Sequence, residues 1–272
     1  KKNSPDSIFV NHQLCGIEET SESVELKFTN NKKYEFDFVI GADGNKSTVR
    51  SIIIGDDDPE FAGYVAWRGL VATKDLSEGD FDECGSSAFI SPGRVFARYL
   101  VRNGDIYNYV GFLTTDEWAE EGWSIPSKVE TVLNVFSDYN QQVKNIIAAT
   151  PPDRCYKWGI FTRKPINKWS SEKVTLLGDA AHPVVPFMGQ GATMAIEDAV
   201  VIGRIIDDSS SPSEIINRYE NARVERAHFI MEHSKKAGER FTGANPDKYT
   251  KEDHMNEEEL GLFNYDPGSV IV

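Results

Sequence analysis

The sequence has little positive charge and no long apolar run. Its 272 residues include 29 lysines and arginines against 43 acidic residues, which gives a formal net charge of −14. Nucleic acids and anionic membrane surfaces both attract basic faces, so this balance argues against either as a partner. No apolar run approaches the roughly 18–20 residues that a membrane span needs, so we expect no membrane insertion.

Cysteine is also scarce. Cys15, Cys84 and Cys155 lie far apart, and no two of them have the spacing of a metal or redox motif. This pattern predicts free thiols in a reducing compartment. The five histidines are scattered, so no metal is expected. The polar start, KKNSPDS, is unlike a signal peptide, and we expect a cytoplasmic location.

The apolar patterns predict strands in the first part of the chain. Alternating Val24, Leu26 and Phe28 indicate a strand, Asn30 and Asn31 a turn, and the next strand run ends at Ile40. Residues 61–113 hold four aromatic and β-branched runs separated by turn residues. We expect them to form one antiparallel sheet.

Helices are predicted later in the chain. Residues 127–149 have a helical apolar period, 157–165 form a short strand, and 173–182 read as a buried strand before a helix over 189–206. Ser211, Pro212 and Glu214 form a capping box that begins a helix ending near Arg240. The acidic tail, 243–272, is expected to be mostly irregular.

Two segments place an aspartate just after a strand. They are VIGADGNKSTVR (39–50) and LLGDAAHPVVPFMGQG (176–191). Ligands bind at the carboxyl ends of such strands, where a carboxylate can accept hydrogen bonds from ribose. In the second segment the first N–H groups of the helix beginning near Gly189–Gly191 favour a phosphate or the anionic edge of a reduced flavin. The alternative is that Asp179 only caps a helix and the glycines and prolines only shape turns.

These two segments resemble the internal fingerprints of the single-component FAD-dependent aromatic hydroxylases. AGYVAWRGLV, PGRVFARYLVRNGDIYNYVGF and FTRKPINKWSSEKVTLLGDAAHP are similar to the salicylate hydroxylase and 3-hydroxybenzoate 6-hydroxylase branch. The resemblance covers most of residues 35–240. It implies a mixed α/β fold of the p-hydroxybenzoate hydroxylase type. The expected parts are the end of the first half of an FAD domain (1–58), an antiparallel-sheet substrate domain (59–168), a second FAD-domain segment (169–240) and a tail (241–272).

The resemblance also implies roles for individual residues. Asp179 would bind the ribityl or ribose part of FAD, and Pro186 would lie beside the flavin ring and the substrate. Asp43 and Arg50 would lie near the FAD pyrophosphate and the path of NAD(P)H. The pyrimidine edge of the flavin would be held by backbone amides around the helix start, those of Gly189, Gln190, Gly191, Ala192 and Thr193. The implied reaction uses NAD(P)H and O2 to hydroxylate an aromatic, phenol-like molecule. A homodimer is the expected assembly.

The sequence departs from the family in two places. The family opens with a strand-GxGxxG-helix unit that holds the ADP part of FAD, and these 272 residues contain no GxGxxG. Tight FAD binding by the chain alone is therefore not expected, and a catalytically silent binding protein is an alternative. Val95 stands where the branch has a histidine that deprotonates the substrate. A heteroaromatic or non-aromatic substrate is therefore an alternative. Tyr99 matches a substrate-facing tyrosine, so Tyr99 or a water would handle the proton.

Other side chains have two interpretations each. His182 is either an acid/base or, more simply, a packed loop histidine. Arg68 either binds a substrate carboxylate, together with Tyr99 and Val95 in the substrate pocket, or makes a surface salt bridge. Glu197 and Asp198 are expected to face solvent. Three aromatic residues are expected in the core, namely Trp67, Phe89 and Phe96.

Overall fold

The computed structural model describes residues 7–55, 57–80, 85–118, 122, 124–243, 258 and 260–272. Cys84 lies outside them, and the described Cys15 and Cys155 are free thiols. The chain divides into unit 1 (Lys1–Pro59, Thr162–Lys235 and Asn256–Val272) and unit 2 (Glu60–Phe161 and Lys236–Met255). The second division therefore follows Phe161, whereas the sequence suggested a division after residue 168.

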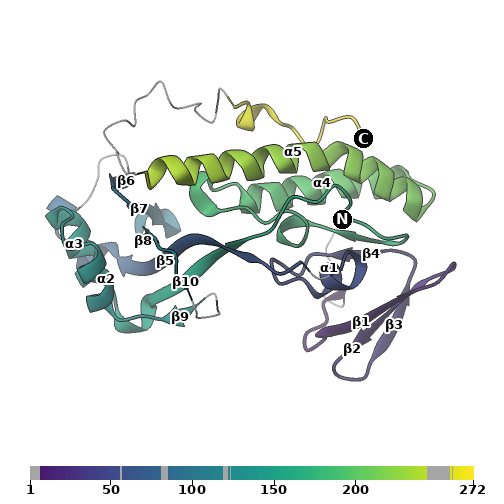
Figure 1. The fold of residues 1–272 in the computed structure, drawn as a ribbon, viewed down its shortest axis with the longest axis horizontal. Coiled ribbons are helices and arrows are strands. Elements are labelled where there is room, and N and C mark those ends of the chain that lie inside the picture. The colour runs from purple at the N-terminus through teal and green to yellow at the C-terminus, as the bar shows by residue number, and fades with distance from the viewer. Residues whose placement is uncertain are drawn as a thin grey trace. The chain divides into compact units, whose positions relative to one another are not determined.

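The strands and helices follow one another as Figure 1 shows. The strands are β1 (Leu14–Glu19), β2 (Val24–Phe28), β3 (Lys33–Phe36), β4 (Val39–Gly41), β5 (Glu60–Ala72), β6 (Ser86–Ser91), β7 (Arg94–Val101), β8 (Ile106–Thr114), β9 (Ile125–Pro126), β10 (Cys155–Thr162) and β11 (Val174–Leu176). The α-helices are α1 (Thr48–Ile53), α2 (Val129–Val135), α3 (Gln141–Ala148), α4 (Gly191–Asp208) and α5 (Pro212–Phe241). Short 3-10 helices cover Thr73–Asp75, Glu78–Asp80, Arg102–Gly104, Pro152–Arg154, Gly178–Ala180, Pro186–Met188 and Leu262–Asn264. Among the described residues, no helix is both long and apolar enough to cross a membrane.

Unit 1 contains the strands predicted for the first fifty residues. β1, β2 and β3 form an antiparallel sheet, and Asn31 makes the predicted turn with a φ of 65°. Val24, the first of the alternating residues, is completely buried in the core of this unit. A second sheet pairs β4 with β11 in parallel, with Val39 opposite Val174 and Gly41 opposite Leu176. The carboxyl ends of these two strands therefore lie side by side.

Helices α4 and α5 run side by side in unit 1 (Figure 1). Their facing apolar residues join the core around β11, among them Val201, Ile205, Tyr219 and Ile230. The predicted start of α5 is confirmed, since Ser211 Oγ accepts from the Glu214 N–H at 3.3 Å. The Glu214 carboxylate accepts a hydrogen bond from the N–H of Ser210 at 3.0 Å, one residue earlier than in an ideal capping box.

Unit 2 is built on a six-stranded sheet in the order β6-β7-β8-β5-β10-β9. The prediction of one antiparallel sheet over residues 61–113 is confirmed, because β5, β6, β7 and β8 pair antiparallel in that sheet. Trp67 and Phe96 are buried in its core, and Phe89 packs against that core, as predicted. The helical period of 127–149 belongs to two helices, because Asn140 caps α3 by accepting from the Val143 N–H.

Candidate functional site

Asp43 follows β4 and organises the turn into α1. Its carboxylate accepts hydrogen bonds from Ser47 Oγ at 2.5 Å and from the Val49 N–H at 3.1 Å, and the Asp43 residue itself is exposed to solvent. Ser47 in turn caps α1 by accepting from the Arg50 N–H. Gly41 is needed here because a Cβ would lie 2.6 Å from a Val49 methyl. The strand end thus presents one carboxylate in a fixed turn.

Arg50 joins this turn to the second fingerprint. Its completely buried guanidinium donates to the carbonyls of Ala180 and Ala181, at 3.1 and 2.9 Å, and pairs with the carboxylate of Asp57. Asp57 also accepts from Arg163 at 2.6 Å. Desolvation would raise the pKa of Asp57, but the two guanidinium groups outweigh it and hold that pKa below its usual value. Arg50 therefore contacts protein groups through each of its guanidinium nitrogens, and its predicted place near a cofactor stays a prediction.

Asp179 lies in the loop after β11. Gly178 before it has a φ of 62°, which favours glycine. The exposed carboxylate of Asp179 lies 3.9 Å from the place that a Cβ on Gly191 would occupy, at the start of α4. Desolvation by the surrounding loop raises its pKa, against the opposing effect of His182. The alternative that Asp179 caps the helix is wrong, because the N-cap residue of α4 is Gln190.

The chain from Pro186 to Thr193 leads into α4. Pro186 opens a 3-10 turn that ends at Gly189 with a φ of 64°. The side chain of the N-cap residue, Gln190, makes no capping hydrogen bond, and Ala192 and Thr193 in the first turn of α4 are exposed. An uncapped N-terminus of an 18-residue helix carries free N–H donors and a positive partial charge. Together with the neighbouring Asp179, this arrangement suits a ligand that has both hydroxyl groups and an anionic edge.

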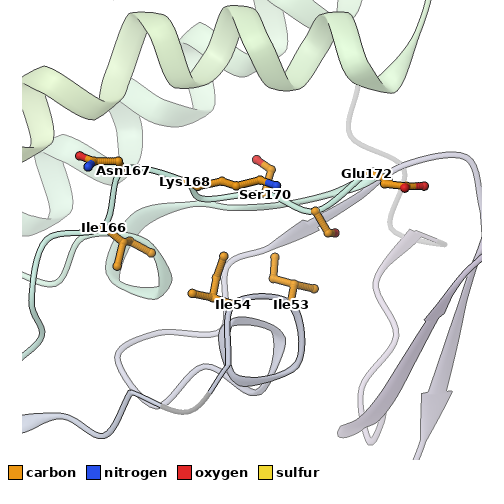
Figure 2. A pocket seen from close by; sticks show the side chains of 8 residues that line it. Ile53, Ile54, Ile166, Asn167, Lys168, Ser170 and Glu172 are labelled. Carbon is orange, nitrogen blue, oxygen red and sulfur yellow. The ribbon is translucent and has the colours of Figure 1, made fainter.

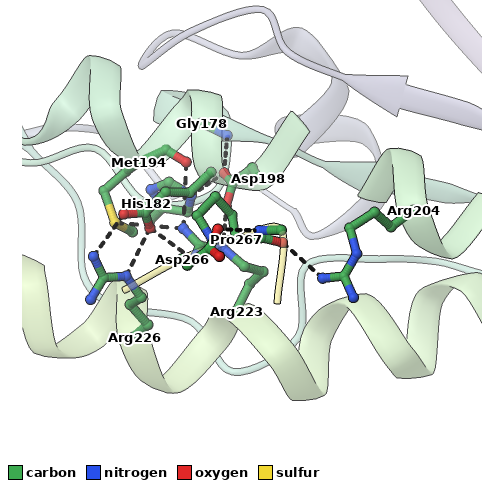
Figure 3. Close-up of polar contacts among 11 residues, drawn as sticks. Gly178, His182, Met194, Asp198, Arg204, Arg223, Arg226, Asp266 and Pro267 are labelled. Atoms are coloured by element: carbon green, nitrogen blue, oxygen red, sulfur yellow. Dashed lines mark hydrogen bonds and ion pairs between the residues drawn. The ribbon is translucent and has the colours of Figure 1, made fainter. Parts of the chain in front are cut away.

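The interpretation of Glu197 and Asp198 as solvent-facing residues is wrong. Asp198 is completely buried and accepts from the Gly178 N–H, from His182 Nε2 and from Arg223 Nε, at 3.0, 2.6 and 2.7 Å (Figure 3). Glu197 is buried as well and binds Arg226 through both of its oxygens. Desolvation would raise the pKa of Asp198, but His182, Arg223 and the Gly178 N–H outweigh it and lower that pKa. His182 is 2% exposed and packs 5.0 Å from the ring of Trp169, which agrees with a packed loop histidine.

The sequence carried a signal for this buried cluster. Glu197 and Asp198 fall three and four residues after Met194, and each falls four residues before another buried residue of α4, Val201 and Ile202 respectively. Residues at this spacing share one face of a helix. Arg223 and Arg226, three residues apart on α5, supply the opposite charges.

The predicted substrate residues share one face of the sheet in unit 2. Val95 pairs with Phe112 and Tyr99 pairs with Asn108, while Arg68 pairs with Val110. Residues paired in this way point to the same side of an antiparallel sheet. Tyr99 is 44% exposed, whereas Val95 is buried. The guanidinium of Arg68 lies 5.7 Å from the ring of Trp158, and within the described part of the chain it has no ion pair, so the expected surface salt bridge is not found there.

A cavity of about 620 Å³ lies elsewhere in unit 1 (Figure 2). Ile53, Ile54 and Ile166 form its apolar part, and Lys168 and Glu172 lie at its polar side. None of the predicted cofactor residues lines it. The loop and helix start after β11 therefore remain the candidate site.

Comparison with known proteins gives a family match over most of the chain. The sequence model of the family described as "FAD binding domain" matches residues 2–234. The 3-amino-4-hydroxybenzoate 2-monooxygenase PtmB3 of Streptomyces platensis is 32% identical over 87% of this chain and 59% of its own length. The 6-hydroxynicotinate 3-monooxygenase of Bordetella bronchiseptica is 34% identical over 87% of this chain and 62% of its own length. The chain thus spans about three fifths of these curated relatives.

The fold is similar to that of solved flavoprotein hydroxylases. A salicylate hydroxylase solved as a substrate complex matches 95% of this chain and 67% of its own with a TM-score of 0.81 and 24% identity. The expected mixed α/β fold of the p-hydroxybenzoate hydroxylase type is confirmed at this level.

Proposed function

Because the chain belongs to the FAD binding domain family, we propose that it works as an FAD-dependent monooxygenase that hydroxylates an aromatic small molecule with NAD(P)H and O2. The observation that carries the proposal is the exposed carboxylate of Asp179 beside the uncapped start of α4. Relatives 32% and 34% identical are named as monooxygenases of an aminohydroxybenzoate and of a hydroxynicotinate, which supports the same reaction class.

The residues of the candidate site fit part of an FAD molecule. Asp179 would accept hydrogen bonds from the ribityl or ribose hydroxyls, and the first N–H groups of α4 would face the pyrimidine edge. The described residues around Gly189–Thr193 leave this helix start exposed for such a contact. FAD, when bound, supplies electron transfer from NAD(P)H and the activation of O2. The positive end of α4 would stabilise negative charge on the ring edge.

The sheet face of unit 2 would hold the substrate. Arg68 would bind a carboxylate, because a guanidinium matches its planar geometry. The hydroxyl of Tyr99 would hydrogen-bond a ring hydroxyl, and Tyr99 or a water would take up its proton. Val95 would add apolar contact and exclude water. The proposed substrate is therefore an aromatic carboxylate that carries a hydroxyl group.

Val95 also favours a second substrate class. An apolar side chain at this position cannot accept a proton from a phenol, so the ring bound there can belong to a different chemical class. The 6-hydroxynicotinate 3-monooxygenase relative acts, by its name, on a heteroaromatic ring. A heteroaromatic acid is therefore the alternative substrate.

The test begins with the colour of the purified full-length protein, because these 272 residues alone are not expected to bind FAD tightly. FAD added to it should be retained and released on denaturation, and the loaded protein should then consume NAD(P)H and form hydroxylated product from a panel of 3-hydroxybenzoate, salicylate and 6-hydroxynicotinate. NAD(P)H oxidation without product would not count. A protein that cannot be loaded with FAD would refute the proposal and favour a catalytically silent binding protein.

A cytoplasmic location is part of the proposal. Its support is the free state of Cys15 and Cys155, since disulfides are rare in that compartment. A homodimer is the proposed assembly, which light scattering on the purified protein would test.

A further inference from the structure

The C-terminal segment packs on the buried charges behind the candidate site. The ring of Tyr265 lies over two guanidinium groups of α5, with its centre 5.1 Å from that of Arg223 and 3.8 Å from that of Arg226. Contacts of this kind stabilise a cation, more strongly when water is excluded. The tail residue Tyr265 therefore covers the charge cluster from one side.

Other residues fix this segment to the helices. Leu262 is buried in the core of unit 1. Arg204 of α4 donates to the carbonyls of Pro267 and Val270, at 2.8 and 3.0 Å (Figure 3 shows Arg204 and Pro267). The position of Tyr265 is thus set by contacts on both sides of it along the chain.

Arg223 connects Tyr265 to the loop after β11. This completely buried arginine binds Asp198 at 2.7 Å and Glu197 at 2.9 Å. Asp198 uses its other oxygen to hold both ends of the loop, the Gly178 N–H and the His182 ring. Asp179, between those ends, has an exposed carboxylate. Each link from Tyr265 to the loop is a direct contact.

We propose that Tyr265 is a positioning residue for the cofactor loop: by keeping water from Arg223 and Arg226 it strengthens the Arg223–Asp198 pair, and this pair holds Gly178–His182 in the geometry that presents Asp179. The part that concerns the cofactor rests on the proposed function. Attraction between charges weakens as water enters, so loss of the ring loosens the loop while the fold persists.

The test compares three variants of the full chain. Tyr265→Leu removes the ring, Tyr265→Phe keeps it, and Phe263→Leu makes a matched change at a position of the same segment that is 71% exposed. Hydrogen exchange of the Gly178 and His182 amides is measured without FAD. We expect Tyr265→Leu to speed their exchange by about threefold to tenfold, and the other two variants to match the parent protein.

Several results would overturn the proposal. They are unchanged loop exchange in Tyr265→Leu, an equal effect of Tyr265→Phe or Phe263→Leu, and faster exchange that extends equally to β8 or accompanies global unfolding. FAD titration followed by flavin fluorescence is the second arm. We expect a threefold to tenfold rise in the dissociation constant, on the order of one cation–π contact, for Tyr265→Leu alone.

The two arms separate the inference from the proposed function. Faster loop exchange with unchanged FAD affinity would overturn the role of Tyr265 in cofactor binding. If no variant of the full-length protein, including the parent, binds FAD, the proposed function fails, and the exchange data still decide whether Tyr265 positions the loop.

Discussion

Asp179 and Asp198 have the same side chain and opposite surroundings. Asp198 is completely buried with three hydrogen-bond donors, and its pKa is lowered. Asp179 is exposed, and desolvation by its loop raises its pKa. The first arrangement stabilises the fold and the second leaves a carboxylate available to a ligand. Single substitutions should therefore separate stability from binding.

We predict that Asp179→Asn weakens FAD binding without lowering stability. Loss of hydrogen bonds to a charged acceptor should raise the FAD dissociation constant roughly tenfold to a hundredfold. The denaturation midpoint in urea should stay equal or rise, because the raised pKa of Asp179 means that the folded chain disfavours its charged form. Asp207→Asn, at an exposed position of α4, is the control. A lowered urea midpoint for Asp179→Asn would contradict this separation.

We predict the reverse balance for Asp198→Asn. It leaves the buried Arg223 without its anionic partner at Nε, so the free energy of unfolding should fall by roughly 2–4 kcal/mol. Urea denaturation followed by circular dichroism would measure it, with Asp207→Asn again as control. A loss below about 0.5 kcal/mol, typical of a surface change, would show that the cluster stabilises little.

Two glycines, one on a strand and one on a helix, have different surroundings. Gly111 on β8 faces the ring of Phe136, and a Cβ there would lie 2.6 Å from it. Gly203 on α4 is exposed, and a Cβ there would meet no atom of the described chain within 4 Å. The same substitution should therefore have opposite effects.

We predict that Gly111→Ala destabilises the chain by roughly 1–3 kcal/mol, because the ring of Phe136 must move to admit the methyl group. Gly203→Ala should stabilise it by about 0.5–1 kcal/mol, because alanine loses less backbone entropy in a helix. Thermal unfolding of both variants beside the parent would test the pair. Equal shifts of the same sign would contradict this assignment of the two positions.

Local patterns predicted most elements, and long-range contacts set the rest. Alternation at Val24, Leu26 and Phe28 is sufficient to predict a strand, and the capping box is sufficient to predict the start of α5. The hydrogen bonds from Arg50 to Ala180 and Ala181 cross about half the chain, and no local pattern specifies them. Glu197 and Asp198 were misread because their partners lie on α5, although their helical spacing was visible. The cofactor roles of the predicted residues remain proposals, since they depend on a bound group.

For the whole molecule, two effects of pH oppose one another. A net charge of −14 disfavours the compact state through repulsion, and acidification relieves it. The folded chain also lowers the pKa of paired carboxylates in both units, including Asp57 and Asp198 in unit 1 and Asp138 in unit 2. Mild acid should therefore be tolerated before these pairs are lost.

We predict that stability falls as the pH drops below about 4, the range in which aspartate protonates in an unfolded chain. A carboxylate whose pKa is lower in the folded state contributes stability above its unfolded pKa, and this contribution is lost as the pH falls towards the folded value. Urea midpoints measured from pH 7 to pH 3 should show the loss. Asp198→Asn should flatten the curve at the acid end, because one such carboxylate is gone, whereas Asp207→Asn should follow the parent. If Asp198→Asn and the parent lose stability in parallel, the buried cluster is not a source of acid sensitivity, and general titration of the surface must account for it.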